Sequence, residues 1–387
     1  MMTATRRGVP GTILFIFLIF FLNMLSRLGL APLLPGIENE LSLSHAAAGS
    51  LFLFVSVGYG SGLLGSTFIS ARICHQHQIV LSSIAVGASL LVISFTSNLW
   101  SLRWTLYVLG IAGGLYLPSG VATLTSLVDR QHWGKVLSLH QLAPNLAYLC
   151  SPLLAEIFLH QYSWRFTLAL YGVAAILAGV LFQLLGKTDR AYGEAPGIAS
   201  IGRLLVNPAI WIMILLFSLA IGVNQGLFNI MALYLTAERQ LDSTQANHLM
   251  SVSRVVAFAM PLLAGWFADR YGLRKTLFAS VAASAAATFS IATLPVSWLG
   301  ASLVLQATSS VCFFPLGFTV LSRITTDNNR NMAVALTVPF SYLFGAGMVP
   351  TLIGYTGDMG SFNWGIGILG VATLFGLLLL RYVRPPS

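Results

Sequence analysis

The sequence predicts an all-α membrane protein in which twelve transmembrane helices form two pseudo-symmetric six-helix bundles. Three observations support this prediction: the apolar composition, the number of long apolar runs and an internal repeat. Hydrophobic residues make up 56% of the 387 residues and charged residues only 8%, whereas a soluble globular chain carries about 25% charged residues. So few charges do not cover a soluble surface, but they suit helices that are surrounded by lipid.

The apolar runs give the number of spans, because a transmembrane helix needs about 20 consecutive apolar residues. The twelve predicted spans cover roughly residues 11–35, 46–69, 79–98, 100–127, 136–159, 164–186, 209–235, 246–268, 275–295, 297–322, 332–356 and 362–382. The first run follows Arg6 and Arg7, as in a signal peptide. It is long, lacks a small-residue cleavage site and precedes eleven further spans, so we interpret it as an uncleaved helix.

The basic residues predict the orientation. Most of them lie at the termini and in every second loop, whereas the spans and the other loops hold only Arg27, Arg103, Arg165, Arg239 and Arg254. Positive loops stay on the cytoplasmic side, so we expect a multi-pass protein of the cell membrane, of the bacterial inner-membrane type, with both termini in the cytoplasm. The same bias accounts for the net charge of +9, and we expect no nucleic-acid partner.

The longest polar stretch divides the spans six and six. We predict an N-terminal bundle over residues 1–186, a cytoplasmic linker over 187–208 and a C-terminal bundle over 209–387. An offset of 200 residues relates the halves, as it pairs Glu38 with Glu238, Leu41 with Leu241, and Gly65 with Gly265. Duplicated halves are frequent in transporters, where the substrate site lies between the repeats near the membrane midplane.

The loop after the predicted eighth span carries the most specific motif. Residues 265–275 read GWFADRYGLRK, which resembles the G-x-x-x-D-R-x-G-R-[RK] signature of the major facilitator superfamily. The resemblance implies a gating motif made of Gly265, Asp269, Arg270, Gly272, Arg274 and Lys275. Here Gly265 would allow close approach of helices, Gly272 a tight turn, and Asp269 a pairing with an arginine. The alternative is an ordinary basic loop, and the equivalent first-half loop has Ile69 in place of the acid.

Two arginines lie inside apolar runs, Arg27 in the first and Arg254 in the eighth. A cation at membrane depth costs about 2.5–3.5 kcal/mol or more, so such residues usually face a cavity and mark a substrate pathway. Acidic residues are nearly absent from the spans, apart from Glu156. This imbalance predicts an anionic substrate. The alternatives are that Arg27 extends to the membrane surface, and that Arg254 is a structural residue bonded to backbone carbonyls.

The surroundings of both arginines carry further resemblances. Residues 26–44 read SRLGLAPLLPGIENELSLS, which is similar to a segment of organic-anion and phosphate-ester transporters of the same superfamily; Tyr59 also fits that group. Arg254 shares a helical face with Phe258 and Pro261, as in the eighth span of monocarboxylate and oxalate–formate carriers. In both groups the arginine binds the anion. Here Ser26 stands where an acid is usual, which removes a candidate for proton coupling.

Polar residues at mid-span complete the predicted binding site. Asn23 lies four residues before Arg27, so the two share a helical face. The others form stripes at helical spacing, Gln141, Asn145 and Tyr148 in the fifth span, and Gln225 and Asn229 in the seventh. Their amides and phenol would recognise a polar anion through hydrogen bonds; alternatively they join helices to one another. We expect His140, at a predicted helix end, to lie at the surface.

The sequence therefore predicts a secondary transporter that moves a small organic anion, a carboxylate or a similar compound, by alternating access. One alternative is an exporter of drug-like or metabolite compounds with structural arginines; another is a membrane sensor or scaffold that does not transport. We expect no enzyme activity, cofactor or metal, because no nucleotide loop, metal cluster or nucleophile motif is present. Cys74, Cys150 and Cys312 are scattered thiols. The expected partners are the anionic substrate and the lipid bilayer, and we expect a monomer.

Overall fold

The computed structural model describes residues 9–186, 188, 191–193, 206–325 and 330–382, with only the backbone at 330–332. Both chain ends and most of the predicted linker 187–208 lie outside the described residues. Within them, twelve helical spans are long and apolar enough to cross a membrane, which confirms the number predicted from the apolar runs. The predicted and observed ends agree to within about six residues, because apolar length sets both.

The helices follow one another in this order: α1 Val9–Leu28, α2 Leu30–Leu41, α3 His45–Ser70, α4 His75–Ser94, α5 Leu99–Gly114, α6 Tyr116–Ser126, α7 Trp133–Leu159, α8 Trp164–Leu185, α10 Pro208–Ile221, α11 Leu227–Ala237, α12 Ser243–Ala257, α13 Met260–Tyr271, α14 Leu273–Thr293, α15 Val296–Val311, α16 Phe313–Arg323, α17 Arg330–Tyr342, α18 Val349–Asp358 and α19 Phe362–Leu379. A short 3₁₀ turn, η1 (Arg130–His132), precedes α7. Two π-helical segments, η2 (Gly222–Gly226) and η4 (Leu343–Met348), interrupt the seventh and eleventh spans.

Glycine and proline account for two of the breaks within spans. Between α1 and α2, a Cβ at Gly29 would lie 2.9 Å from the Tyr171 ring of α8, so only glycine fits there. Between α12 and α13, Pro261 occupies the first turn of α13. Proline has no N–H to donate and suits a helix start, which favours a new helix at this point.

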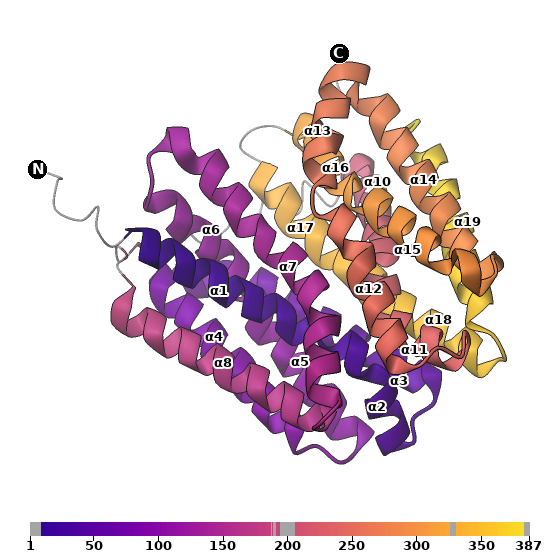
Figure 1. Ribbon diagram of the computed structural model, residues 1–387. Coiled ribbons are helices and arrows are strands. Elements are labelled where there is room, and N and C mark those ends of the chain that lie inside the picture. The colour runs from indigo at the N-terminus through magenta and orange to yellow at the C-terminus, as the bar shows by residue number, and fades with distance from the viewer. Residues whose placement is uncertain (1–8, 187, 189–190, 194–205, 326–329, 383–387) are drawn as a thin grey trace, which may run out of the picture. The chain divides into compact units, whose positions relative to one another are not determined.

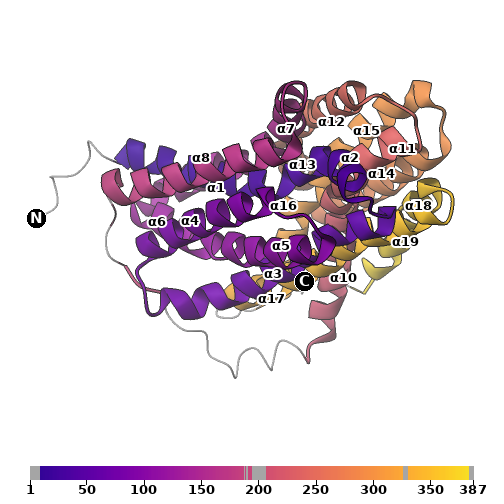
Figure 2. The same cartoon turned by 90° about the horizontal axis from the view of Figure 1, so that it is seen from below.

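The chain separates into two compact units, residues 1–30 with 58–196, and residues 31–57 with 197–387. In the first unit α4 packs along α8, and α1 packs against α7. In the second unit α14 packs along α19 and α15, as Figure 1 and Figure 2 show. The segment 31–57 thus packs with the second unit, although it precedes the linker in sequence. The predicted bundles 1–186 and 209–387 stay a prediction.

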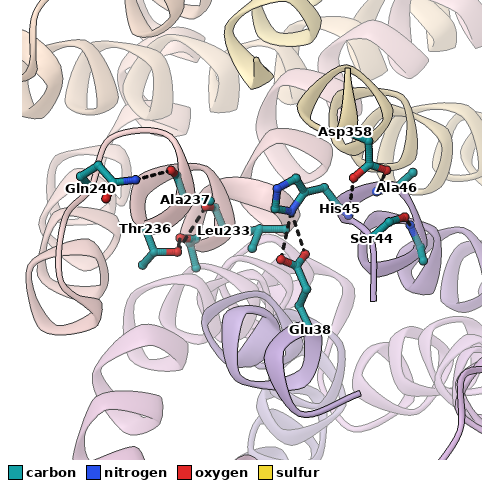
Figure 3. A network of polar contacts seen from close by, with 11 residues as sticks. Glu38, Ser44, His45, Ala46, Leu233, Thr236, Ala237, Gln240 and Asp358 are labelled. Carbon is teal, nitrogen blue, oxygen red and sulfur yellow. Dashed lines mark hydrogen bonds and ion pairs between the residues drawn. The ribbon is translucent and has the colours of Figure 1, made fainter. Parts of the chain in front are cut away.

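In the second unit, carboxylates lie at the starts of helices. Asp358, at the end of α18, accepts hydrogen bonds from the backbone amides of His45 (2.8 Å) and Ala46 (2.9 Å) at the start of α3 (Figure 3). Glu238 accepts one from the amide of Phe362, at the start of α19 (3.3 Å). Asp242 caps α12 in the same way. These amides have no partner within their own helix, and the positive end of the helix dipole favours a negative charge.

His45 contacts two acidic residues in Figure 3: its ring lies against Glu38, and its backbone amide donates to Asp358. The Nδ1 atom of His45 lies 3.0 Å from the Glu38 carboxylate. The His45 ring also packs against Phe362, with 4.7 Å between ring centroids. The start of α3 is therefore fixed to α2, α18 and α19 within the second unit.

Candidate functional site

Arg27 lies in the interior of the first unit, near the end of α1. The residue is only 3% exposed, so its side chain packs inside the protein. Its Cζ atom lies 4.0 Å from the centroid of the Tyr59 ring, a distance at which a cation is attracted to an aromatic face. The predicted neighbours Asn23 and Tyr59 are thus brought together with Arg27.

The hydrogen bonds of Arg27 go to neutral groups. Its Nη2 atom donates to Met24 Sδ at 3.2 Å and to Asn23 Oδ1 at 3.5 Å. Asn23 is held in place because its own Nδ2 donates to the carbonyl of Gly113 on α5, at 3.2 Å. Among the described residues, no hydrogen-bond acceptor meets the buried Nε atom of Arg27. The Nε side of the guanidinium is therefore available for an acceptor that the described residues do not supply.

Arg254 lies in the interior of the second unit, in the last turn of α12, where it is 6% exposed. Its Nη1 atom donates to Asn224 Oδ1 at 2.7 Å, and its Nη2 atom donates to the backbone carbonyl of Asn224 at 3.0 Å. The Cζ atom also lies 4.9 Å from the Phe228 ring centroid. Asn224 thus makes two hydrogen bonds with Arg254, a contact that the sequence did not predict; its neighbour Gln225 stays a predicted binding residue.

The π-helical segment η2 explains how Asn224 reaches Arg254. A π-helical turn bonds residue i to i+5, which shifts the register and is frequent at functional sites. Neighbouring α15 holds this segment, because Gln306 Nε2 donates to the carbonyl of Val223 at 2.7 Å and Ser310 Oγ donates to Asn224 Oδ1 at 3.3 Å. The position of Asn224 is thus fixed by contacts from two helices.

The second π-helical segment, η4, packs directly against η2. A Cβ at Gly226 would lie 2.3 Å from the carbonyl oxygen of Gly345, so the two backbones touch. Asn229 Nδ2 donates to the carbonyl of Ala346 at 3.1 Å, while its buried Oδ1 atom meets no donor among the described residues. Gln225 lies inside η2, and with Asn229 it stays a predicted binding residue.

The predicted polar stripe of the fifth span lies on α7. Asn145 Nδ2 donates weakly to the carbonyl of Gln141, at 3.4 Å, and Tyr148 is buried. Within the described residues, the hydrogen bonds of Arg27 go elsewhere, so neither amide of this stripe contacts it. These residues stay predicted binding residues.

The predicted gating motif spans the end of α13 and the start of α14. Gly272 adopts a positive φ of 94°, which confirms the expected tight turn, because side-chain-bearing residues rarely adopt this conformation. Among the described residues, a Cβ at Gly265 would meet no atom within 4 Å, and the close helix approach at this glycine stays a prediction. Asp269 is exposed, and Arg270 lies 5.6 Å from the Trp266 ring centroid.

His140 corrects one expectation, because it is buried (2% exposed) instead of lying at the surface. Its ring stacks on Phe20, with 4.1 Å between centroids. Tyr116 donates its hydroxyl hydrogen to the carbonyl of Ile16 at 2.8 Å and lies 2.9 Å from His140 Nε2. A phenol has one hydrogen to donate, so His140 must carry its proton on Nε2 and donate to Tyr116. The burial of His140 could have been inferred from its position, because it lies seven residues after the start of α7, beyond the polar end of the helix.

The described residues contain no group of three His, Cys, Asp or Glu side chains that could hold a metal ion. Cys74 and Cys312 are buried, and all three cysteines are free thiols. The chemistry that these sites offer is therefore recognition by buried cations and amides.

Comparison with known proteins identifies the family. The family model described as Major Facilitator Superfamily matches residues 16–238 and 219–387. The chain belongs to the major facilitator superfamily. It is a multi-pass membrane protein of a transporter family, not an enzyme.

Relatives and solved structures agree with this assignment to the superfamily. The membrane sensor protein UhpC of Salmonella typhimurium is 27% identical over 350 residues, which cover 81% of this chain and 75% of the sensor. Its Escherichia coli counterpart is 24% identical over 348 residues, with the same coverage. The crystal structure of the nucleoside transporter NupG superposes with a TM-score of 0.82 at 12% identity, covering 96% of this chain and 99% of that one. At that identity the likeness establishes the twelve-helix fold alone.

Proposed function

We propose that this protein is a secondary transporter that moves a small organic anion, a carboxylate or a phosphate ester, by alternating access. Arg27 and Arg254 bind the negative charge, and nearby amides set the shape of the substrate. The residues from Gly265 to Lys275 serve the gate.

The observation that carries the proposal is the neutral surroundings of a buried cation. Arg27 is held by an amide, a thioether and a tyrosine ring, and its Nε atom has no acceptor among the described residues. Desolvating a charge without a counter-charge is costly, and a carboxylate or phosphate supplies that counter-charge with two acceptors in the geometry of a guanidinium edge. Arg254 supports the same chemistry, because this second buried cation donates to the amide oxygen and the backbone carbonyl of Asn224 and lies over the Phe228 ring.

A second candidate function is ligand sensing without transport. Two relatives that each align with 81% of this chain are named membrane sensor proteins. A sensor would keep the anion site and lose net flux. Binding and flux must therefore be measured separately.

Binding is tested with the purified full-length protein and a panel of carboxylates, phosphate esters, sugars and organic cations. A ligand that binds only the folded protein raises its melting temperature. We expect one anion class to stabilise the protein and to lose this effect in Arg27→Gln and Arg254→Gln. Arg130→Gln is the matched control, because Arg130 is exposed and lies outside both sites. Stabilisation only by lipophilic or cationic compounds, unchanged in both site variants, would replace the proposal with an exporter.

Flux is tested in proteoliposomes with the anion that stabilises the protein. Uptake of labelled anion in exchange for unlabelled anion, lost in the Arg27 and Arg254 variants, supports a transporter. Binding with no exchange or net uptake in either direction supports a sensor and contradicts transport.

A further inference from the structure

An apolar groove of about 820 Å³ lies between α14 and α19, on the outside of the second unit, and no part of the proposed transport function uses it. Its lining residues are Phe289, Ala292, Thr293, Asn363, Trp364, Gly367, Ile368, Val371, Ala372 and Phe375. On α19 the lining positions recur every three to four residues, so they form one face of the helix. Ile368 and Phe375 are more than 60% exposed.

The floor of the groove is made by small residues. A Cβ at Gly367 would meet only the Cβ of Ala292, at 3.9 Å, and a Cβ at Gly370 would lie 3.0 Å from the backbone of Phe289. The helices therefore approach closely along this line. The lining of the groove is mostly apolar and includes Phe289, Trp364 and Phe375.

The length of the groove matches one leaflet of a membrane. From Asn363 to Phe375 the helix advances twelve residues, or about 18 Å at 1.5 Å per residue. Half of the hydrocarbon core of a bilayer is about 15 Å. The polar lining residues Asn363 and Thr293 lie at the end of the groove where α19 begins and α14 ends. Trp364 lies at the same end, the position that tryptophan favours at the membrane–water interface.

A cation lies at this polar end. Arg239 follows the seventh span by two residues, and its Nη2 atom donates to the carbonyl of Ile291 (2.7 Å) and to Asn363 Oδ1 (3.3 Å). Its Nε atom donates to Tyr234 Oη at 2.5 Å. Within the described residues no hydrogen bond uses its Nη1 atom and no carboxylate oxygen lies within 4.0 Å, because Glu238 turns to the start of α19 instead.

We infer that this groove binds one acyl chain of a membrane phospholipid, and that the phosphate of the headgroup accepts a hydrogen bond from Arg239. The bilayer around these spans supplies such a molecule, with an apolar chain of leaflet length and a phosphate at the membrane surface. The acyl chain covers the apolar face of α14 and α19. The phosphate supplies the acceptor that the Nη1 atom of Arg239 lacks among the described residues.

The test uses the full-length protein, purified in detergent with phosphatidylglycerol, and counts retained lipids by native mass spectrometry. Gly367→Leu fills the groove, and the backbone has room for the new side chain. Gly11→Leu is the matched control, because a Cβ at Gly11, on α1, would meet no atom within 4 Å. Arg239→Gln removes the charge. Glycerol phosphate and diacylglycerol serve as probes for the headgroup and for the chains.

We expect the wild-type protein and Gly11→Leu to retain one phosphatidylglycerol, and Gly367→Leu to bind it at least about tenfold more weakly. Arg239→Gln should bind phosphatidylglycerol no better than diacylglycerol, since a charge-assisted hydrogen bond corresponds to about tenfold or more in affinity. Equal retention by Gly367→Leu and Gly11→Leu would overturn the proposal. Two other results would also overturn it. One is displacement of the bound phosphatidylglycerol by glycerol phosphate alone, which indicates a simple ion site. The other is equal binding of phosphatidylglycerol and diacylglycerol by the wild type.

Discussion

Replacing Gly345 by alanine should damage the second unit, because this glycine lies where the two π-helical segments touch. A Cβ at this position would be 2.5 Å from the carbonyl oxygen of Ser218, 2.7 Å from the amide nitrogen of Gly222 and 2.8 Å from the Cβ of Ile221. Comfortable contacts between such atoms are about 3.5–4.0 Å. Two of these three atoms belong to the backbone and cannot rotate away.

The expected cost follows from these overlaps. Forcing extra atoms into a well-packed interior costs about 1–3 kcal/mol. Alanine offsets up to about 1 kcal/mol of this through its better helix propensity. Three overlaps below 3.0 Å place the cost at the upper end of that range, so the net loss should be about 2 kcal/mol, and the shift of η2 should also displace Asn224, two residues beyond Gly222. Gly345→Ala should therefore weaken anion binding at Arg254 as well as stability.

The measurement is a thermal melt of the purified protein, with and without the stabilising anion. Gly300→Ala is the matched control, because its Cβ would meet only Leu249 Cδ2, at an ordinary 3.5 Å. The control should melt at or above the wild-type temperature. If Gly345→Ala melts together with the control, the two π-helical segments do not pack as described and the reasoning is wrong.

Three further substitutions test other contacts. Asn224→Asp places a carboxylate beside Nη1 of Arg254 and should weaken anion binding at least about tenfold in the same thermal assay, because it neutralises the cation; unchanged binding would remove Arg254 from the site. Asp358→Ala leaves the start of α3 uncapped and should cost about 1 kcal/mol of stability, so a wild-type melting curve would contradict the cap. Tyr116→Phe should destabilise more than His140→Phe, by about 1–3 kcal/mol, because it leaves the buried Nε2–H of His140 without an acceptor, whereas His140→Phe leaves the Tyr116 hydroxyl bonded to the Ile16 carbonyl; the reverse order in denaturant melts would refute the assigned tautomer.

Hydropathy predicted the spans well because the length of an apolar run is a local property that membrane thickness selects. Helical spacing placed Asn23 beside Arg27, since the two lie four residues apart on one helix, whereas Tyr59 was chosen from a resemblance to other transporters. The sequence also predicted the glycine turn at Gly272, because a positive φ admits few other residues.

The contacts of Arg254 could not be predicted in the same way. A π-helical segment has no distinctive composition, so a stripe of Gln225 and Asn229 at α-helical spacing was the natural hypothesis. Asn224, which lies inside such a segment, is the residue that accepts the hydrogen bond from Arg254. His140 was expected at the surface because it lies close to a loop, and its burial depends on Phe20, a residue 120 positions earlier that no local pattern connects to it.

The cap on α3 has a consequence for the order in which the protein is made. Asp358 accepts a hydrogen bond from the backbone amide of His45, and it is synthesised 313 residues after it. At about 5–20 residues per second, the ribosome needs roughly 15–60 seconds to bridge that interval. During this time the start of α3 depends on water for its hydrogen bonds, and residues 31–57 lack most of the unit in which they finally pack. The second unit is therefore completed only when the twelfth span leaves the ribosome, although its first segment is among the earliest to enter the membrane.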